Sequence, residues 1–292
     1  MPAGGRPTVR SRRLGAALRR YREAAKLDQQ HAARHIAGSI TKISRLESGQ
    51  VSARPGDVRL LLELYGVRDR DTYLRLEQLA RNSNKRGWWL DYPWAAKQEY
   101  TDVITLESDA TYIRTWQPLF IPGLLQTPAY VRALLDASLT VHSPDAVEEM
   151  VAIREARKRV IEEDGARFAA VIYEPALTAP MPSREAHREQ LSHILSVAQR
   201  QNVSVQVLPM TEWRAAHMTS HFVMYSFGPE PAPEAVAFDS TTSTVILEDL
   251  EEMTQHAQIF EALRSAALTP KESMSFLRKS MEEISDRKED EG

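Results

Sequence analysis

Two histidines four residues apart are the most suggestive chemical pair in the sequence. His217 and His221 have the spacing at which two imidazole rings on one helix face can chelate a metal ion. However, no glutamate of an H-E-x-x-H motif accompanies them, and the segment that follows, residues 222–227, has the composition of a strand. We therefore interpret them as unrelated polar residues and expect no metal site.

A cluster of acidic side chains is the second candidate for metal binding. It comprises Glu248, Asp249, Glu251 and Glu252. These residues stand where a helix is expected to begin, and negative charge is favoured there by the helix dipole. We interpret the cluster as a helix start.

Motifs for catalysis are missing from the sequence. It contains no G-x-S-x-G, no G-x-x-x-x-G-K and no G-x-G-x-x-G, and it has no cysteine to act as a nucleophile or zinc ligand. We predict no catalytic residue, no cofactor and no enzyme activity. No stretch approaches the ~18 apolar residues of a membrane helix, and the basic N-terminus lacks the apolar segment of a secretory signal. These features predict a soluble, cytoplasmic protein without a membrane partner.

The charges of the chain are divided unevenly along its length. Residues 1–86 hold 19 Lys and Arg against 8 Asp and Glu, a net charge of +11, whereas residues 87–292 hold 18 against 32, a net charge of −14. A basic first segment followed by an acidic remainder suggests that only the first part binds a polyanion.

The elements that would position such a surface are helices. Apolar residues at helical spacing predict helices over residues 12–25, 28–36 and 40–48, with Asp28 and Ser39 as N-caps and Gly49 as a stop. Two more helices are expected around residues 60–65 and 73–79.

Beyond residue 84 the pattern changes to mixed α and β structure. We expect helices over 126–136, 144–163, 183–200, 248–267 and 271–285, and short strands over 168–173, 203–208, 222–227, 235–238 and 242–247. The predicted fold class is a mainly α five-helix N-terminal domain plus a larger α+β C-terminal domain. The segment between them carries Trp88, Trp89, Tyr92 and Trp94, which pin the linker onto its own domain or form an exposed docking strip.

The segment from Leu14 to Val67 carries a recognisable motif. It has a Q-x-x-A-A core starting at Gln29 and an I-S-R-L-E-S-G run starting at Ile43, with no insertion between the two helices. It resembles the xenobiotic-response-element type of helix-turn-helix, the lambda/434-repressor class. Small side chains at Ala32 and Ala33 let the two helices cross closely, and Ile36, Ile43 and Leu46 supply apolar contacts. The third helix would then lie in the major groove of double-stranded DNA.

The resemblance implies a set of residues that contact DNA: Gln29, Gln30, Ser39, Ile40, Thr41, Lys42, Ser44 and Arg45. In this family the base readers fall on Ile40 and Thr41, with Lys42 nearby, whereas Arg45 reaches a guanine or a phosphate. Gln29 and the two serines would contact the DNA backbone.

The chain departs from the family pattern in two places. Ala37 stands where the glycine between the helices is usual, with Gly38 one place later. Ile40 replaces a polar reader, so its contact would be apolar, as with a thymine methyl group. The resemblance also implies that Arg22 and Glu47 form a partly buried structural ion pair.

A second motif runs from Trp116 to Tyr130, W-x-P-x-x-I-P-G-L-L-Q-T-P-x-Y. It is similar to the signature of actinobacterial WhiJ-like regulators, which join this helix-turn-helix to a C-terminal domain. In place of the family's usual R-Q pair the chain has Arg157-Lys158. The motif is interpreted as architectural, or as a partner or ligand surface that involves Trp116, Gln126, Thr127 and Tyr130.

These observations predict a sequence-specific transcriptional regulator. Residues 1–11 would form a flexible basic arm, 12–83 the DNA-binding domain, 84–98 an aromatic linker, 99–285 the effector or partner domain, and 286–292 a frayed tail. Because one small module gives little genomic specificity, we expect a homodimer on two half-sites. The C-terminal domain would receive a small-molecule effector or a small protein partner. The alternative is an antitoxin-like protein that binds a partner and autoregulates its operon.

DNA binding by this chain should depend steeply on salt. Each phosphate that the basic segment neutralises should lower the slope of log K against log salt concentration by about 0.9. Fluorescence anisotropy with a specific duplex over a salt series measures this slope. An affinity that does not change with salt would contradict the assignment of the basic segment as the contact surface.

Overall fold

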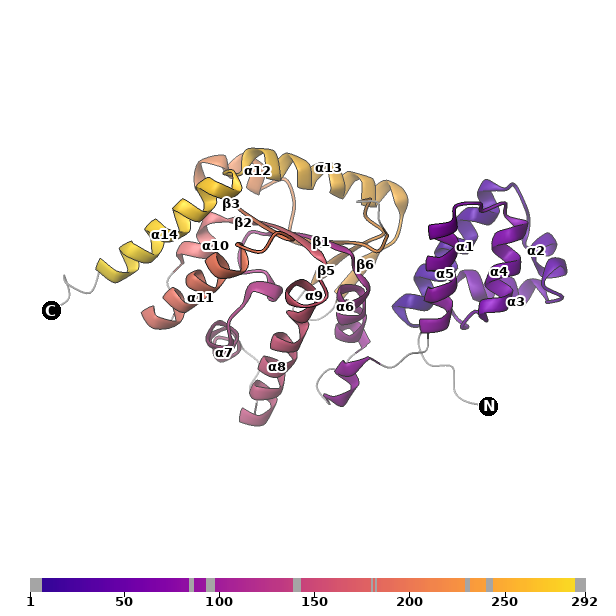
Figure 1. Ribbon diagram of the computed structural model, residues 1–292, viewed down its shortest axis with the longest axis horizontal. Coiled ribbons are helices and arrows are strands. Elements are labelled where there is room, and N and C mark those ends of the chain that lie inside the picture. Colours follow the sequence, from indigo (N-terminus) through magenta and orange to yellow (C-terminus); the bar gives the residue numbers. More distant parts are fainter. Residues whose placement is uncertain are drawn as a thin grey trace. The chain divides into compact units, whose positions relative to one another are not determined.

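The computed structural model describes residues 7–83, 87–92, 98–138, 143–179, 181, 183–228, 232–239 and 244–286. The chain divides into two compact units, Met1–Leu90 and Asp91–Gly292 (Figure 1). The first unit is helical and the second combines helices with a six-stranded sheet, as the predicted fold class requires. No helix in the described part of the chain has the length and apolarity needed to cross a membrane.

Five α-helices make up the first unit: α1 (Val9–Ala24), α2 (Gln29–His35), α3 (Ile40–Glu47), α4 (Pro55–Leu64) and α5 (Arg70–Asn82). A short 3-10 helix, η1 (Trp88–Asp91), follows. The predicted caps are confirmed, since Asp28 accepts a hydrogen bond from the backbone N–H of His31 and Ser39 accepts one from that of Lys42. These bonds satisfy donors that a helix start otherwise leaves open.

The start of α1 corrects the expected end of the flexible arm over residues 1–11, because residues 8–11 belong to the helix start. Thr8 caps α1, and Val9 is fully buried. The Thr8 hydroxyl donates to the carbonyl of Ser83 and Arg10 donates to that of Asn82, so the first turn of α1 is tied to the end of α5. Residues 1–6 lie outside the described residues. Of the aromatic residues in the linker, Trp89 is buried, and Trp94 lies outside the described residues.

The core of the first unit depends on small residues where helices meet. Ala32 and Ala33 of α2 are buried against Ile43 and Leu46 of α3. A Cβ atom at Gly15 of α1 would lie 2.4 Å from the backbone oxygen of Leu46, so α1 and α3 approach at a distance that only glycine permits. This close packing fixes the position of α3 within the unit.

The second unit is built on a mixed sheet with strand order β3-β2-β1-β4-β5-β6. β1 (Tyr112–Gln117), β2 (Arg167–Tyr173) and β3 (Val203–Leu208) are parallel. β4 (Phe222–Ser226) runs antiparallel to β1, and β5 (Ala235–Asp239) and β6 (Thr244–Leu247) continue antiparallel. The parallel strands are joined by helical crossovers, which parallel pairing requires.

The helices of this unit cover both faces of the sheet. They are α6 (Gln98–Asp109), α7 (Pro128–Asp136), α8 (Pro144–Arg157), α9 (Arg159–Glu162), α10 (Glu174–Thr178), α11 (Arg184–Val197), α12 (Trp213–Ala216), α13 (Leu250–Ala266) and α14 (Pro270–Asp286), with 3-10 turns η3 (Gly123–Leu125) and η4 (Met210–Glu212). Figure 1 shows α13 over one face and α6, α8 and α11 beneath the other. The predicted helix over residues 144–163 is divided into α8 and α9 at Lys158.

Alternation along β1 separates the two faces. Tyr112 and Trp116 point into a core that includes Phe260 of α13, whereas Ile113 and Thr115 point to the opposite face and line a cavity. Neither β1 nor α6 was expected from the sequence, although β1 lies in the middle of the sheet.

The turn between α2 and α3 contains a strained residue. Ala37 has a φ of +48°, the left-handed region that glycine adopts most readily. This is the position at which the sequence lacks the expected glycine. The turn therefore has the left-handed geometry usual for glycine, although the Cβ atom of Ala37 makes this conformation less favourable.

Replacing Ala37 with glycine should stabilise the first unit. Ala37→Gly removes a cost of ~1–2 kcal/mol for the left-handed conformation and adds unfolded-state entropy, which leaves a net gain of about 1 kcal/mol. Hydrogen exchange of the α2 and α3 amides in the full chain measures the effect. Ala25→Gly is the control, because Ala25 has an ordinary φ of −75° and the same exchange should destabilise there. Faster exchange of these amides in Ala37→Gly than in wild type would show that the left-handed conformation of Ala37 is not strained.

Candidate DNA interface and ligand pocket

One side of α3 faces the core and the other faces outward. Ile43, Leu46 and Glu47 are buried, whereas Ile40, Thr41 and Arg45 are exposed. Ile40 is 51% exposed. Among the described residues the Arg45 guanidinium makes no ion pair or hydrogen bond within the unit. The outward side of α3 thus offers an apolar group, a hydroxyl and a cation to a partner.

A buried ion pair anchors the end of α3 to α1. Arg22 donates to both carboxylate oxygens of Glu47, at 2.6 Å from Nε and 3.0 Å from Nη2. The two side chains are 10% and 5% exposed. These hydrogen bonds raise the pKa of Arg22. Arg22 also donates to the carbonyl of Leu27, so its guanidinium ties the α1–α2 turn to α3.

Gln29 completes this cluster. Its Nε2 donates to Oε2 of Glu47 at 2.9 Å, so the side chain that was expected to contact the DNA backbone is engaged within the unit. Gln30, the next residue of α2, is exposed. Asp28 places a carboxylate at the same helix start, and hydrogen bonding from His31 lowers the pKa of that carboxyl.

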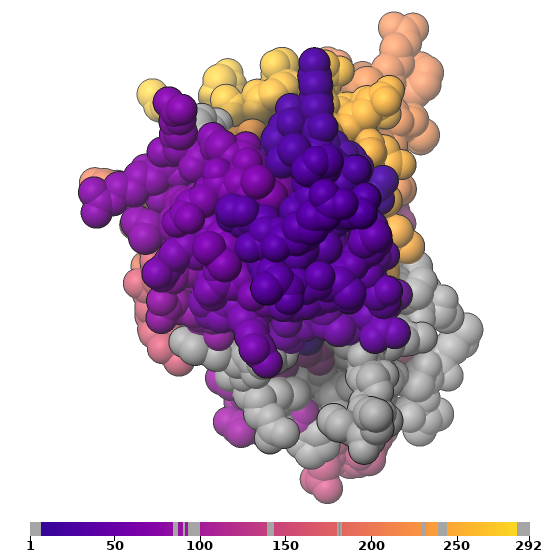
Figure 2. All heavy atoms as spheres, turned by 90° about the vertical axis from the view of Figure 1, so that its right-hand side faces the viewer, coloured from indigo at the N-terminus to yellow at the C-terminus, as the bar shows by residue number. Residues whose placement is uncertain are grey.

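The remaining predicted contact residues lie on the same helix. Ser39 and Ser44 are exposed, and the Ser39 hydroxyl accepts from the N–H of Lys42. Lys42 is partly buried, with Nζ 2.7 Å from Oδ2 of Asp57, which holds its chain against α4. The side chains of the unit form one continuous rounded surface in Figure 2 (indigo to purple).

In the second unit, the structure supports the architectural interpretation of the Trp116–Tyr130 motif and corrects the alternative, a partner surface, for Trp116 and Thr127. Trp116 is fully buried in the core under α13. Thr127 is 3% exposed and caps α7 by accepting from the N–H of Tyr130. The Tyr130 hydroxyl accepts from the N–H of Ile121, which closes the loop after β1 onto α7. These residues shape the domain from inside.

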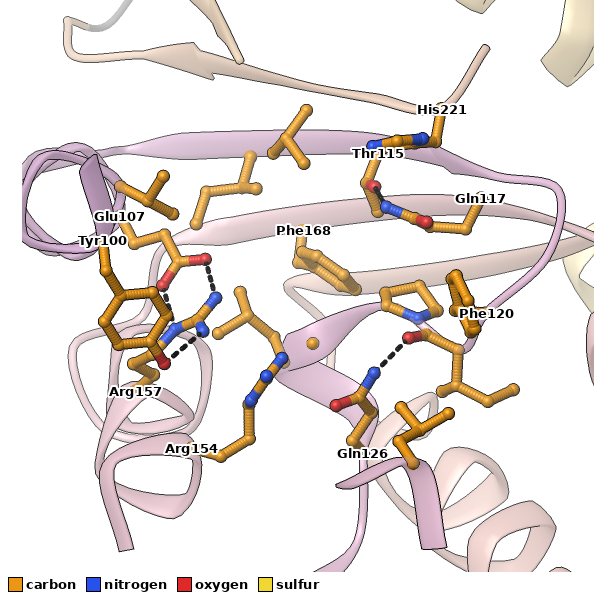
Figure 3. A pocket seen from close by; sticks show the side chains of 18 of the residues that line it. Tyr100, Glu107, Thr115, Gln117, Phe120, Gln126, Arg154, Arg157, Phe168 and His221 are labelled. Carbon is orange, nitrogen blue, oxygen red and sulfur yellow. Dashed lines mark hydrogen bonds and ion pairs between the residues drawn. The ribbon is translucent and has the colours of Figure 1, made fainter. Parts of the chain in front are cut away.

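Tyr130 also lines a cavity of about 330 Å³, and Gln126 borders a larger one. This larger cavity has a volume of about 530 Å³, within the range of small-molecule sites. Its wall comes from α6, β1, β2, β4, α8 and the loop after β1 (Figure 3). The polar lining residues include Glu107, Thr115, Gln117, Gln126, Arg154, Arg157 and His221, and the apolar ones include Ile113, Phe120, Phe168 and Val223.

A second buried ion pair closes one end of this cavity. Arg157 of α8 donates to both oxygens of Glu107 on α6, at 2.7 and 2.6 Å, and to the hydroxyl of Tyr100 at 3.1 Å. Burial opposes the charge on Arg157, but the Glu107 carboxylate outweighs it and raises the pKa of Arg157. The pair links the helix before the sheet to the crossover after β1.

The histidine pair and the acidic cluster lie in ordinary surroundings. His217 contacts the carbonyl of Trp213 on α12, whereas His221 lies at the edge of the cavity. Asp249 caps α13, which confirms the acidic cluster as a helix start. Within the described ranges, no group of three or more His, Asp or Glu side chains is arranged to hold a metal ion.

Comparison with known families places both units. A family model described as "Domain of unknown function (DUF5753)" matches residues 100–279, more than half of the chain. The chain belongs to the DUF5753 family. A second model, described as "Helix-turn-helix domain", matches residues 13–76, from α1 into α5. Searches of curated proteins and of solved structures gave no match.

The helix-turn-helix match indicates that this DUF5753 chain is a DNA-binding regulator. The cavity residues Glu107, Thr115 and Arg154 were missed by sequence reasoning, because they come from segments far apart in the chain. Arg157 was noticed only as a departure from a family pattern. Glu107 lies on α6, a helix that the sequence did not predict, so no signal in the sequence pointed to its pairing with Arg157.

Breaking the Arg22–Glu47 pair should destabilise the first unit strongly. Arg22→Met leaves the Glu47 carboxylate buried without its main partner, a change that costs about 3–5 kcal/mol. Hydrogen exchange of the α1–α3 amides measures it, and the double variant Arg22→Met with Glu47→Leu should recover most of the loss. Arg19→Met is the control, because the pair between Arg19 and Glu23 is exposed. Similar protection in Arg22→Met and wild type would show that the pair is dispensable.

Proposed function

We propose that this chain is a sequence-specific transcriptional regulator of the xenobiotic-response-element type, in which α3 reads bases in the major groove. The observation that carries the proposal is the division of α3 into a buried and an outward side, with Ile40, Thr41 and Arg45 outward. Thr41 can hydrogen-bond a base, Arg45 can pair with guanine, and Ile40 can pack on a thymine methyl group. The helix-turn-helix match and the net charge of +11 over residues 1–86 support the same surface.

The protein acts on DNA as a homodimer in this proposal. A single module of this size reads few bases, and two half-sites about one helical turn apart multiply the specificity. The buried pair of Arg22 and Glu47 serves this function indirectly. It fixes α3 against α1, so that the outward side chains arrive at the groove already oriented.

The DUF5753 domain receives a small ligand in the cavity beneath β1. The size of the cavity and its mixture of apolar walls with a few charged groups support ligand binding. Loading of the cavity then changes the affinity for the operator. An energetic coupling of this kind requires that the ligand favour one state of the protein over another.

Removing the two polar readers of α3 should abolish specific binding while the fold remains. In the full chain, Thr41→Ala with Arg45→Ala should weaken binding to the gene's own upstream DNA at least about thirty-fold, because each base contact contributes ~1–3 kcal/mol. Fluorescence anisotropy against a scrambled duplex measures the loss. Arg68→Ala removes the same charge from an exposed site outside α2 and α3 and should keep specific binding.

An unchanged affinity in the double variant would contradict the assignment of α3. The antitoxin-like alternative is tested on the same protein by native mass spectrometry after purification from its own host. A complex with a small second protein would favour that alternative, and a homodimer alone would favour the regulator.

A further inference from the structure

One of the two cations on α3 is already paired within the first unit. Nζ of Lys42 lies 2.7 Å from Oδ2 of Asp57 on α4, and the two side chains are 37% and 17% exposed. Oδ2 is buried and hydrogen-bonds no other described residue, so the ammonium group of Lys42 is the charge that compensates its burial. Arg45, three residues further along α3, is exposed. The two cations of the proposed reading helix therefore have different surroundings.

The side chain of Lys42 lies over the turn between α2 and α3. A Cβ atom at Gly38 would lie 3.2 Å from Cδ of Lys42 and 3.4 Å from Cγ1 of Ile36. A larger residue at this position would therefore press on the lysine chain. Since the left-handed residue of the turn is Ala37, Gly38 is not needed for that conformation. The glycine instead leaves room for Lys42 to extend from α3 toward α4.

The carboxylate of Asp57 is also favoured by its position in α4. It lies in the first turn of the helix, and the N-cap residue, Arg54, makes no side-chain capping hydrogen bond. Backbone N–H groups at such a helix start favour a negative charge nearby. The helix start and Lys42 thus both stabilise the charge on Asp57, and this fixed carboxylate competes with any phosphate for the lysine.

Pairing with a carboxylate changes what a lysine contributes to DNA binding. A free lysine that neutralises a phosphate releases a condensed counterion and adds affinity that does not depend on base sequence. A paired lysine must first leave its carboxylate, and a partly buried carboxylate without its cation is unfavourable. Lys42 should therefore contribute less to DNA binding than the exposed Arg45.

We propose that Asp57 is a positioning residue of the DNA interface, which holds Lys42 in an ion pair and keeps its ammonium group from the DNA phosphates. Of the two cations on α3, only Arg45 then binds DNA, so Lys42 has a role different from the contact that the family resemblance implies. Asp57 in this way limits the sequence-independent part of the affinity. This inference rests on the proposed function, because it concerns the DNA interface of the same helix.

Asp57→Asn releases Lys42 while the side chain keeps its shape. In the full chain, this variant should bind a scrambled duplex about three-fold more tightly than wild type does. Its slope of log K against log salt concentration should be steeper by about 0.9, the value for one additional phosphate contact. Fluorescence anisotropy over a salt series measures both quantities. A slope equal to that of wild type would overturn the proposal, because the released lysine would then make no new contact.

A second variant separates the release of Lys42 from the simple loss of a negative charge. Adding Lys42→Gln to Asp57→Asn should return the slope to the wild-type value, because neither protein has a lysine at this position that is free to bind a phosphate. A double variant that keeps the steeper slope would overturn the proposal, since the effect would not come from Lys42. A slope shallower than that of wild type would also overturn it, since Lys42 would then already bind DNA in the wild type.

Asp71→Asn is the matched control. Asp71 is an exposed aspartate in the first turn of α5, so the exchange removes the same charge from the same kind of helix position. Its slope should equal that of wild type. Equal steepening in Asp71→Asn and Asp57→Asn would overturn the proposal, because loss of any carboxylate of the unit would then be enough. The far-ultraviolet circular dichroism of each variant confirms that it is folded.

The same titrations separate this inference from the proposed function. Because the duplex is scrambled, the slopes can be compared whether or not the chain reads a sequence. A preference of wild type for the upstream DNA, together with equal slopes in all variants, would leave the regulator intact and reject the role of Asp57. The expected changes in slope without any preference for the upstream DNA would do the reverse.

Discussion

The DNA-binding unit depends on one buried ion pair. Arg22 of α1 grips both oxygens of Glu47 at the end of α3, and Gln29 of α2 donates to the same carboxylate. Three helices therefore converge on one charged group that is almost fully removed from water. Because an unpaired buried charge is costly, the arrangement tolerates little movement of α3 relative to α1 and α2. The close approach at Gly15 acts in the same direction. The outward side chains of α3 inherit their orientation from this cluster.

The second unit also has a buried ion pair that joins two helices. Arg157 and Glu107 join α8 to α6 across one end of the cavity, and the sheet supplies the floor. Since β1 alternates between a core face and a cavity face, Trp116 stabilises the domain while its neighbour Thr115 lines the cavity. A single strand thus links the packing of α13 to the shape of the candidate ligand site.

The first unit could be predicted almost completely from the sequence, because its signals are local. Asp28 and Ser39 cap helices that begin next to them, and small residues mark the helix crossing. The second unit was less predictable. β1 contains Arg114, Thr115 and Gln117 in place of a run of β-branched apolar residues, so the middle strand of the sheet carried no clear signal. The polar residues of β1 are accommodated by contacts with the neighbouring strand. Arg114 donates a hydrogen bond to Ser226 of β4, and Thr115 donates one to the carbonyl of Phe222.

The cavity itself could not be predicted, since five or more distant segments meet there only after folding. Trp116 and Thr127 belong to a motif that was interpreted as architectural or as a partner surface. In the structure Trp116 is buried in the core and Thr127 caps α7. Gln126 has two roles, because its Nε2 closes a loop by donating to the carbonyl of Ile121 and the residue also lines the cavity. The local motif thus identified which residues of the segment from Trp116 to Tyr130 matter, but their roles could be assigned only from the fold.

Selection of bound duplexes from a random DNA pool tests whether α3 reads base sequence. If it does, the full chain should enrich two related half-sites with centres about one helical turn apart. Replacing Ile40 with glutamine should then change the preferred base at one position in each half-site. Enrichment of no sequence, or the same sequence preference in Ile40→Gln and wild type, would show that α3 does not read the bases.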